Sequence, residues 1–161
     1  MSNAAAADIK PSLATEFVFR LSVDVVAPVT VGETGLGVRR QIAIAGGTLA
    51  GPGMNGKILP GGADFQIIRP NGLIDLVARY VIEMDDGALI YVENTGIRTG
   101  PREALERLQR GEAVDPKLIY FRTVPRFETG SDKYRWMMQT LFVATAQRHQ
   151  AQVIIDVYKV L

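Results

Sequence analysis

The chain of 161 residues contains no cysteine and a single histidine, His149. Without cysteine there is no disulfide, no thiolate metal ligand and no cysteine nucleophile. A metal site would depend almost entirely on carboxylates, so we expect neither a metal nor another cofactor. The one histidine lies in the polar stretch AQRHQAQ, which favours a solvated turn over a histidine-based catalytic triad.

An excess of charge and long apolar runs are also missing. The formal net charge is +1, which predicts no strong attraction to nucleic acid or to an anionic membrane. No apolar run approaches the roughly 18 residues of a membrane span, and the N-terminus shows no secretory signal. We therefore expect a cytoplasmic protein with a disordered leader over residues 1–14 and a single domain over residues 15–161.

The sequence does contain a repeated alternation of apolar and polar side chains. Residues 17–25 show this period of two, and several later segments share it, which predicts strands. One helix is convincing over about residues 101–110, with Pro101 in its first turn and Gly111 at its end. These elements predict a mainly β protein built as a single antiparallel β-barrel with one short helix. Residues 134–147 fit either a strand throughout or a strand with a helical start.

A glycine-rich stretch superficially resembles a phosphate-binding loop. Residues 51–57 match the first seven positions of the pattern G-x-x-x-x-G-K-[ST]. Ile58 then stands where a serine or threonine must bind Mg²⁺, and Pro60 prevents the helix that would receive the phosphates. The glycines are better explained by the backbone freedom that a tight connection needs.

Two short turns predict the register of three successive strands. The Asn-Gly pair at residues 71–72 and the Asp-Gly pair at residues 86–87 are strong hairpin signals. With two-residue loops, Asp64 lies opposite Arg79, and Arg79 lies opposite Asn94. Directly paired residues share a face of the sheet, so the three side chains form one polar row.

The row formed by Asp64, Gln66, Arg79 and Asn94 has two interpretations. On the outside of a sheet it would contain an exposed ion pair worth about 0–1 kcal/mol. Inside a barrel it would be a hydrogen-bonded cluster, because buried charges must be paired and satisfied, and such clusters often have a functional role. The residues by themselves leave both interpretations open.

A second group of polar and aromatic residues follows the helix. Tyr120, Arg122, Glu128, Tyr134 and Trp136 are candidates to line a pocket. A carboxylate beside an aromatic wall could act as a general acid or base. In the alternative, the aromatic side chains belong to the core, and Arg122 and Glu128 form a salt bridge.

Three long segments of the chain resemble a known family. They are GGTLAGPGMNGKILPGGADFQIIRPNG, ARYVIEMDDGALIYVENTGIR and YFRTVPRFETGSDKYRWMMQTLFVA, and they resemble the bacterial and fungal family called domain of unknown function 3237. The resemblance covers about residues 15–161, and its motifs, which include LPGGAD-aromatic-Q and N-x-G-x-R, are specific as a set. It implies a small antiparallel β-barrel and attaches no general biochemical activity.

The resemblance also points to individual positions. The polar and aromatic places that recur in the family fall on Asp64, Gln66, Arg69, Arg79, Asn94, Arg98, Tyr120, Arg122, Glu128, Tyr134 and Trp136. Their overlap with the polar row favours the barrel interior for that row. Phe65 stands where tryptophan is common in the family, and Met138 stands where asparagine is expected, which implies a less polar pocket here.

Three hypotheses for function follow from these observations. In the first, the barrel binds a small, partly apolar organic molecule. Its ligand-binding residues would be Gln66, Arg79, Asn94, Tyr120, Arg122, Tyr134 and Trp136. In the second, the protein is a cofactor-free acid–base enzyme of the isomerase, cyclase or dehydratase type, with Glu128 or Asp64 as the proton carrier. In the third, it is a structural or interaction protein. In each case we expect a homo-oligomer without a nucleic-acid or membrane partner.

Overall fold

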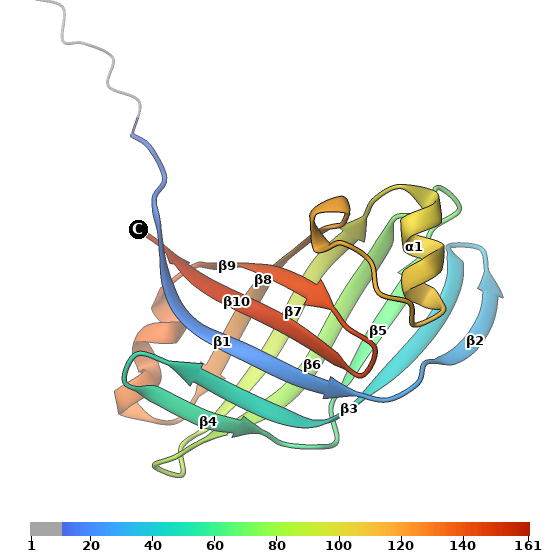
Figure 1. The fold of residues 1–161 in the computed structure, drawn as a ribbon. Helices are drawn as coiled ribbons and strands as arrows, with labels where there is room; N and C mark the ends of the chain where they lie inside the picture. Colours follow the sequence, from blue (N-terminus) through green and yellow to red (C-terminus); the bar gives the residue numbers. More distant parts are fainter. Residues whose placement is uncertain (1–10) are drawn as a thin grey trace, which may run out of the picture.

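Ten strands form one antiparallel sheet that closes into a barrel in the computed structural model, which describes residues 11–161 (Figure 1). The strands are β1 (Thr15–Val25), β2 (Val29–Thr34), β3 (Gly37–Gly51), β4 (Met54–Ile58), β5 (Ala63–Ile68), β6 (Ile74–Met84), β7 (Leu89–Thr99), β8 (Tyr120–Thr129), β9 (Phe142–Arg148) and β10 (Gln152–Val160). Eight of them close the ring in the order β1-β10-β9-β8-β7-β6-β5-β3, because β3 also pairs with β1. The predicted single antiparallel β-barrel is confirmed.

The two remaining strands extend the wall of the barrel. β2 pairs with β3, and β4 pairs with both β3 and β6. Of the predicted leader over residues 1–14, residues 1–10 lie outside the described residues, and β1 begins at Thr15.

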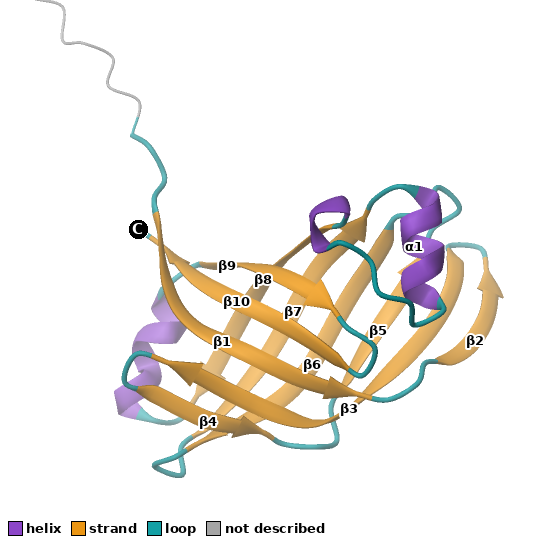
Figure 2. Ribbon diagram, in the orientation of Figure 1, coloured by secondary structure: helices purple, strands orange, loops and turns teal. Residues whose placement is uncertain are grey.

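Three helical segments lie at the two ends of the barrel (Figure 2). They are α1 (Arg102–Gln109) and the 3-10 helices η1 (Pro116–Leu118) and η2 (Asp132–Gln139). α1 is the predicted helix, with Pro101 as its N-cap and Gly111 beyond its end at a left-handed φ of +78°. η2 precedes β9, so the segment of residues 134–147 has the helical start. No helix among the described residues is long and apolar enough to cross a membrane.

The interior of the barrel changes character along its axis. Toward η2 it is apolar, where Phe127 packs edge-to-face against Phe19 and Phe142 with ring centroids 5.7 and 5.0 Å apart. Burying each such ring contributes about 1.5–3 kcal/mol. From the middle of the barrel toward α1, polar side chains enter the interior. The buried polar residues of the described chain are Arg40, Gln66, Asn94, Arg98 and Thr123.

The glycine-rich stretch of residues 51–57 forms the turn between β3 and β4 and most of β4, and not a phosphate-binding loop. Gly47 has a φ of +139°, and a Cβ atom there would lie 2.1 Å from the carbonyl oxygen of Ser22 on β1. Only glycine therefore fits where β1 and β3 meet. Lys57 lies on the outside of β4 and forms an ion pair with Glu83 on β6 at 3.3 Å.

Both hairpins that connect β5, β6 and β7 have three-residue loops, so the predicted register is wrong by one residue in each. In the first, the Arg69 amide donates to the Leu73 carbonyl and the Gly72 amide donates to the Arg69 carbonyl, both at 2.8 Å. Gly72 and Gly87 occupy equivalent places with φ of +86° and +83°. This is a type I turn closed by a left-handed glycine bulge.

The corrected register separates the predicted polar row. Asp64 pairs with Ala78, and Ala78 pairs with Asn94. Because the two one-residue errors cancel across β6, Asp64 and Asn94 still share a face, and that face lines the barrel interior. Arg79 points outward and forms an exposed ion pair with Glu93 at 2.8 Å.

Candidate functional site

A cavity of about 50 Å³ lies inside the barrel. All eight strands of the closed ring contribute to its wall, which is largely apolar and built from valine, isoleucine, leucine and phenylalanine side chains. Its polar wall consists of Asp64, Gln66, Tyr80, Asn94, Arg98, Thr123 and Arg148. Since one water molecule needs about 10–15 Å³ of such space, the cavity has room for several waters or a small organic group.

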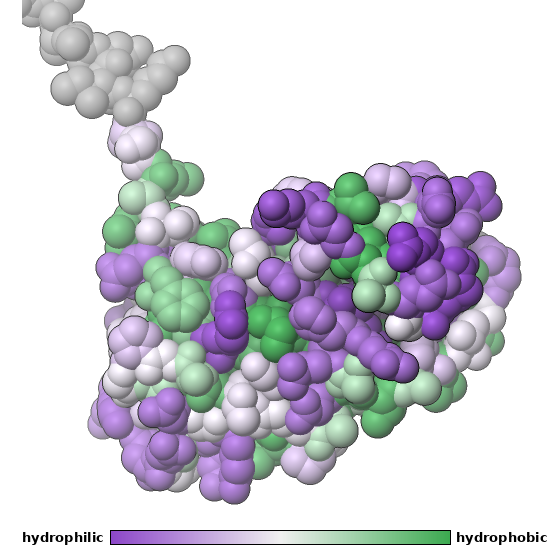
Figure 3. Space-filling model, viewed as in Figure 1, coloured by the Kyte–Doolittle hydropathy of each residue, from purple (hydrophilic) through white to green (hydrophobic). Residues whose placement is uncertain are grey.

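The cavity adjoins an outer hollow at the α1 end of the barrel, which we call the mouth. The mouth measures about 200 Å³ and shares Ile42, Arg98 and Arg148 with the cavity. Its rim is formed by residues 108–111 at the C-terminal end of α1, by residues 27–28 between β1 and β2, and by side chains near the β9–β10 turn. Hydrophilic side chains gather over α1 on the face shown in Figure 3.

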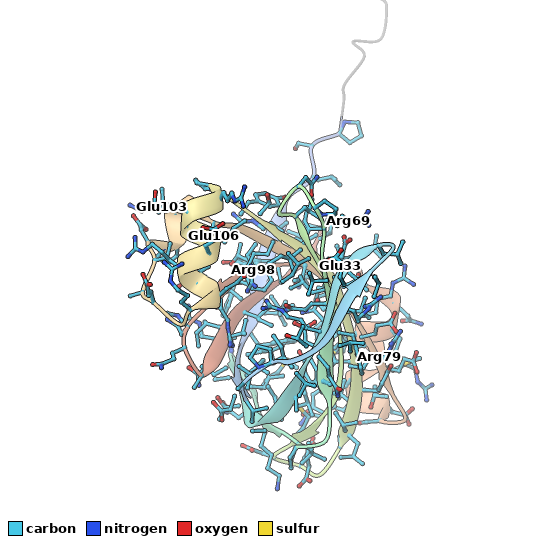
Figure 4. All side chains as sticks on the ribbon, turned by 90° about the vertical axis from the view of Figure 1, so that its right-hand side faces the viewer. Glu33, Arg69, Arg79, Arg98, Glu103 and Glu106 are labelled. Atoms are coloured by element: carbon cyan, nitrogen blue, oxygen red, sulfur yellow. The ribbon has the colours of Figure 1, made fainter. Side chains whose placement is uncertain are left out.

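Figure 4 looks at the barrel from the end where α1 lies. Arg98 lies within the ring of strands, whereas Arg79 lies at its periphery. The two arginines belong to adjacent strands, β7 and β6. Their opposite placement follows from the corrected register.

A chain of hydrogen bonds holds the carboxylate of Asp64 in the wall. The Arg40 Nε–H donates to Gln66 Oε1 at 2.7 Å, and Gln66 Nε2 donates to Asp64 Oδ2 at 2.5 Å. Gln66 is only 1% exposed, so its amide has no alternative partners in bulk water. Asp64 is intermediate in exposure as a residue, but its Oδ1 atom is buried and has no hydrogen-bond partner.

Six buried side-chain polar atoms of the described residues lack a hydrogen-bond partner, and all six belong to residues that line this cavity. They are Asp64 Oδ1, Tyr80 Oη, Asn94 Oδ1, Arg98 Nε, Thr123 Oγ1 and Arg148 Nη1. Buried polar groups are nearly always paired, and each unpaired one costs about 1–3 kcal/mol. The fold therefore concentrates unmet hydrogen-bonding capacity, both donors and acceptors, around one small space.

Arg98 is the most deeply buried charged group of the site. It is 3% exposed, and its guanidinium carbon lies 5.4 Å from the centroid of the Phe121 ring. Burial, together with the nearby charges of Arg40 and Arg148, lowers the pKa of Arg98 to about 10. That value still leaves the guanidinium charged near neutral pH. Burial also lowers the pKa of Arg40 and of Arg148.

Among residues 11–161, Asp64 alone contributes a carboxylate to the wall of the cavity or the mouth. Burial raises the pKa of Asp64, and this effect outweighs the hydrogen bond from Gln66 and the attraction of the three arginines. Burial likewise raises the pKa of the Tyr80 hydroxyl. Within residues 11–161, no three histidine, aspartate or glutamate side chains gather in a way that could hold a metal ion.

The structure divides the predicted site residues into those inside the barrel and those outside it. Asp64, Gln66 and Asn94 line the cavity. Glu128 is exposed on the outer face of β8, where it borders a shallow hollow with Tyr91.

The remaining predicted residues lie in two further places. Tyr120 and Arg122 border an outer groove of about 760 Å³, with the Arg122 guanidinium 5.0 Å from the Tyr120 ring centroid. Tyr134 and Trp136 belong to η2 at the far end of the barrel. Tyr134 donates its hydroxyl to Asp86 at 3.1 Å, and Trp136 packs on the apolar core.

Several residues of the cavity and of its mouth were not assigned a role from the sequence. They are Arg40, Tyr80, Arg98, Thr123 and Arg148, of which Arg98 alone was a recurring position of the family resemblance. A signal for two of them is present in the alternation. Arg40 has the same parity as the buried Ile42 and Ile44 on β3, and Arg148 has that of the buried alanines on β9. An arginine at a strand position whose side chain points inward indicates a polar interior.

Comparisons with known proteins place relatives across nearly the whole chain. The family described as "Protein of unknown function (DUF3237)" matches residues 13–160. A UPF0311 protein of Bradyrhizobium diazoefficiens is 60% identical over 151 residues, which cover 94% of this chain and 99% of that protein. A crystal structure of a conserved protein of unknown function from Rhodopseudomonas palustris is 57% identical with a TM-score of 0.93, covering 94% of this chain and 100% of the other.

A more distant neighbour comes from a fungus. The crystal structure of an enzyme from Penicillium herquei is 20% identical with a TM-score of 0.71, covering 95% of this chain and 98% of that enzyme. At this level of identity the likeness shows a shared barrel fold alone.

Proposed function

This chain belongs to the DUF3237 family of proteins of unknown function, and from that premise we propose that it binds a small, partly apolar organic molecule in the barrel cavity. The observation that carries the proposal is the position of the unpartnered polar atoms, all six of which line this one cavity. Small-molecule sites combine a mainly apolar wall with a few convergent polar groups. The apolar wall takes the hydrocarbon part of the ligand, and the unpartnered atoms take its oxygen or nitrogen atoms.

Gln66 and Asn94 remain ligand-binding residues in this proposal, now joined by Asp64, Arg98 and Tyr80. The hydrogen bonds from Arg40 through Gln66 fix one carboxylate oxygen of Asp64. A fixed carboxylate is pre-organised, so little entropy is lost when a ligand binds to its free oxygen. A purely structural barrel gains nothing from unpaired polar atoms around an internal space, which favours binding over the structural hypothesis.

The test is a cavity-filling substitution with a matched control on the same strand. Ala78 lines the cavity between Asp64 and Asn94, whereas Val77 points to the outside. The ¹⁵N-labelled protein is titrated with small aromatic and aliphatic alcohols, amides and carboxylic acids, and its amide chemical shifts are followed by NMR. We expect at least one compound to shift cavity residues, and Ala78→Leu to weaken its binding at least tenfold while Val77→Leu does not. If no compound gives shifts that Ala78→Leu removes, the proposal is wrong.

A second candidate function is acid–base catalysis on the bound molecule, and it is favoured by the state of Asp64. One carboxylate oxygen is held by Gln66, the other is free in the cavity, and the pKa of the group is raised. Such a carboxyl group keeps its proton to a higher pH than an ordinary aspartate does and has a free oxygen through which to transfer it. The guanidinium of Arg98 would stabilise negative charge that develops on the substrate. In this proposal Asp64, rather than the outward-facing Glu128, is the proton carrier.

We also propose that the chain forms a homo-oligomer through the outer face of β7, β8 and β9. Ile97, Val124 and Val143 are 36%, 49% and 39% exposed, and all three border the outer groove. Adjoining exposed apolar side chains are typical of an association surface. Sedimentation analysis should show an oligomer that Val124→Glu dissociates. A monomeric wild-type protein would contradict this.

A further inference from the structure

Arg98 is a buried guanidinium without an anionic partner. It is 3% exposed, and among residues 11–161 it forms no ion pair and no side-chain hydrogen bond. Its Nε atom is buried, unpartnered and part of the cavity wall. The Phe121 ring at 5.4 Å offers a weak cation–π contact, which offsets only part of the unfavourable burial of a charge.

Two more arginines line the mouth beside Arg98, and neither forms an ion pair within residues 11–161. Arg148 lines both the cavity and the mouth, and its buried Nη1 atom has no partner. Arg40 is 8% exposed and donates from Nε to the neutral amide of Gln66 rather than to a carboxylate. Arg40, Arg98 and Arg148 all line the mouth, so the three charges lie close together.

One carboxylate faces these three guanidinium groups. Asp64 forms no ion pair with Arg40, Arg98 or Arg148, and its Oδ2 atom accepts from Gln66. Even with Asp64 ionised, the site holds three positive charges against one negative charge. A buried excess of positive charge is unfavourable unless a negatively charged group binds there and pairs with it.

We infer that the ligand of this cavity is an organic anion, with a carboxylate that lies between Arg98 and Arg148 and a hydrocarbon part that packs on the apolar wall. The inference rests on the proposed function and specifies the class of molecule that the cavity takes. Guanidinium groups bind carboxylates with two parallel hydrogen bonds, and Arg98 Nε and Arg148 Nη1 are donors that lack any other partner. The apolar wall distinguishes an organic acid from inorganic phosphate, which can use the arginines alone.

The same two arginines explain how an anion would reach the cavity. Arg98 and Arg148 line the mouth as well as the cavity. Among the described residues that line the mouth there is no carboxylate, and Arg40 adds a third guanidinium, whereas Arg110 at the rim is paired with Glu112 at 2.7 Å. Its positive potential attracts anions and repels cations before they enter.

The experiment compares probes that match in shape and differ in charge. Acetate is compared with acetamide, benzoate with benzamide, and inorganic phosphate serves as a third kind of probe, all by NMR titration in chloride-free buffer. We expect each carboxylate to bind at least tenfold more tightly than its amide, and benzoate to bind more tightly than phosphate. Carboxylates that bind no more tightly than their amides overturn the inference. Phosphate that binds more tightly than both carboxylates overturns the assignment of an organic acid.

Variants of two arginines separate the role of Arg98 from general charge. Arg98→Met should reduce the ratio of benzoate to benzamide affinity to about one, and Arg98→Lys should keep part of it because the charge remains. Arg126→Met, on the outer face of β8, should leave the ratio unchanged. An unchanged ratio in Arg98→Met overturns the inference.

The outcomes also distinguish this inference from the proposed function. If amides or alcohols bind in the cavity as tightly as the acids, the proposed function is retained. Only the inference that the ligand is an anion is then wrong. If no probe shifts the resonances of the cavity residues, both are overturned.

Discussion

The guanidinium of Arg98 and the carboxyl group of Asp64 line one cavity and yet form no ion pair. The carboxylate is held on one side by Gln66, and the guanidinium lies over Phe121. Each group keeps one buried atom unpartnered, Oδ1 on Asp64 and Nε on Arg98. The separation leaves both groups able to interact with a molecule placed between the strands that hold them.

Arg98→Met should stabilise the ligand-free protein, because it replaces an unpaired buried charge with an apolar side chain of similar length. We expect the free energy of unfolding to rise by about 1–3 kcal/mol. Urea unfolding at neutral pH measures the change. Arg126→Met, on the exposed outer face of β8, should stay within about 0.5 kcal/mol of the wild type. A loss of stability in Arg98→Met would mean that this guanidinium has a partner in the folded protein.

The pH dependence of stability should change when Asp64 is replaced by asparagine. The folded-state pKa of Asp64 is raised above the usual 3.8, mainly by burial. The stability that this group contributes is therefore fully present below the unfolded-state pKa and is lost as the pH rises through the folded-state pKa. Asp64→Asn does not undergo this loss, so its stability relative to wild type should increase as the pH rises from about 4 through the folded-state pKa of Asp64.

Urea unfolding of both proteins across that range measures the effect. Asp85→Asn, at the exposed β6–β7 turn, is the control and should show no such trend. A difference between Asp64→Asn and wild type that stays constant with pH would mean that Asp64 titrates alike in the folded and unfolded chains.

Gln66→Met should be strongly destabilising, although the side chain volume is nearly preserved. It removes the acceptor of the Arg40 Nε–H and the donor to Asp64 Oδ2. Two charged groups then lose their hydrogen bonds in the barrel wall, and we expect a loss of about 2–4 kcal/mol. Gln147→Met, at an exposed position of β9, provides the comparison in urea unfolding. Equal stabilities of the two variants would show that the hydrogen bonds from Arg40 through Gln66 to Asp64 contribute nothing to the free energy of unfolding.

The sequence predicted the barrel because alternation and turn residues are local properties. It did not predict the register, because an Asn-Gly or Asp-Gly pair fits both a two-residue loop and a three-residue loop that ends in a left-handed glycine. The hydrogen bonds around Gly72 and Gly87 show the second kind. Since the two errors cancel across β6, Asp64 and Asn94 were still correctly placed on one face, while Arg79 was not.

The site was less predictable because it forms only when the barrel closes. Arg40 and Arg148 come from β3 and β9, which are far apart in the chain, and both line the mouth from different parts of the ring. No turn or short-range pattern relates these two positions. The one-residue shift of β6 that turns Arg79 outward also places Tyr80 on the same face as Asp64.

Gly96→Ala should perturb the cavity through the backbone. A Cβ atom at Gly96 would lie 2.4 Å from the Arg122 carbonyl oxygen and 2.5 Å from Thr123 Cγ2. β8 must therefore move away from β7 and take Thr123 with it, at an expected loss of about 1–3 kcal/mol. Gly35→Ala, where nothing lies within 4 Å, should be close to neutral. Unfolding measurements compare the two variants, and similar stabilities would contradict the close packing of β7 on β8.

Two carboxamide substitutions decide whether the bound molecule is also a substrate. The wild-type protein is incubated with a cell extract, and mass spectrometry identifies any metabolite that it consumes. For such a metabolite, Asp64→Asn should lower kcat by about 100- to 10,000-fold, the usual contribution of a general acid or base. Binding should change only a few-fold, because an asparagine side chain has nearly the same shape as the aspartate that it replaces.

Glu128→Gln is the matched variant, because Glu128 lies exposed on the outer face of β8 and away from the cavity. It should leave both turnover and binding unchanged. Loss of turnover in Glu128→Gln with normal turnover in Asp64→Asn would move the chemistry to the outer face of β8. If no metabolite is consumed while compounds still bind in the cavity, the catalytic proposal is wrong. The protein is then a binding protein, and Asp64 contributes to recognition of the ligand.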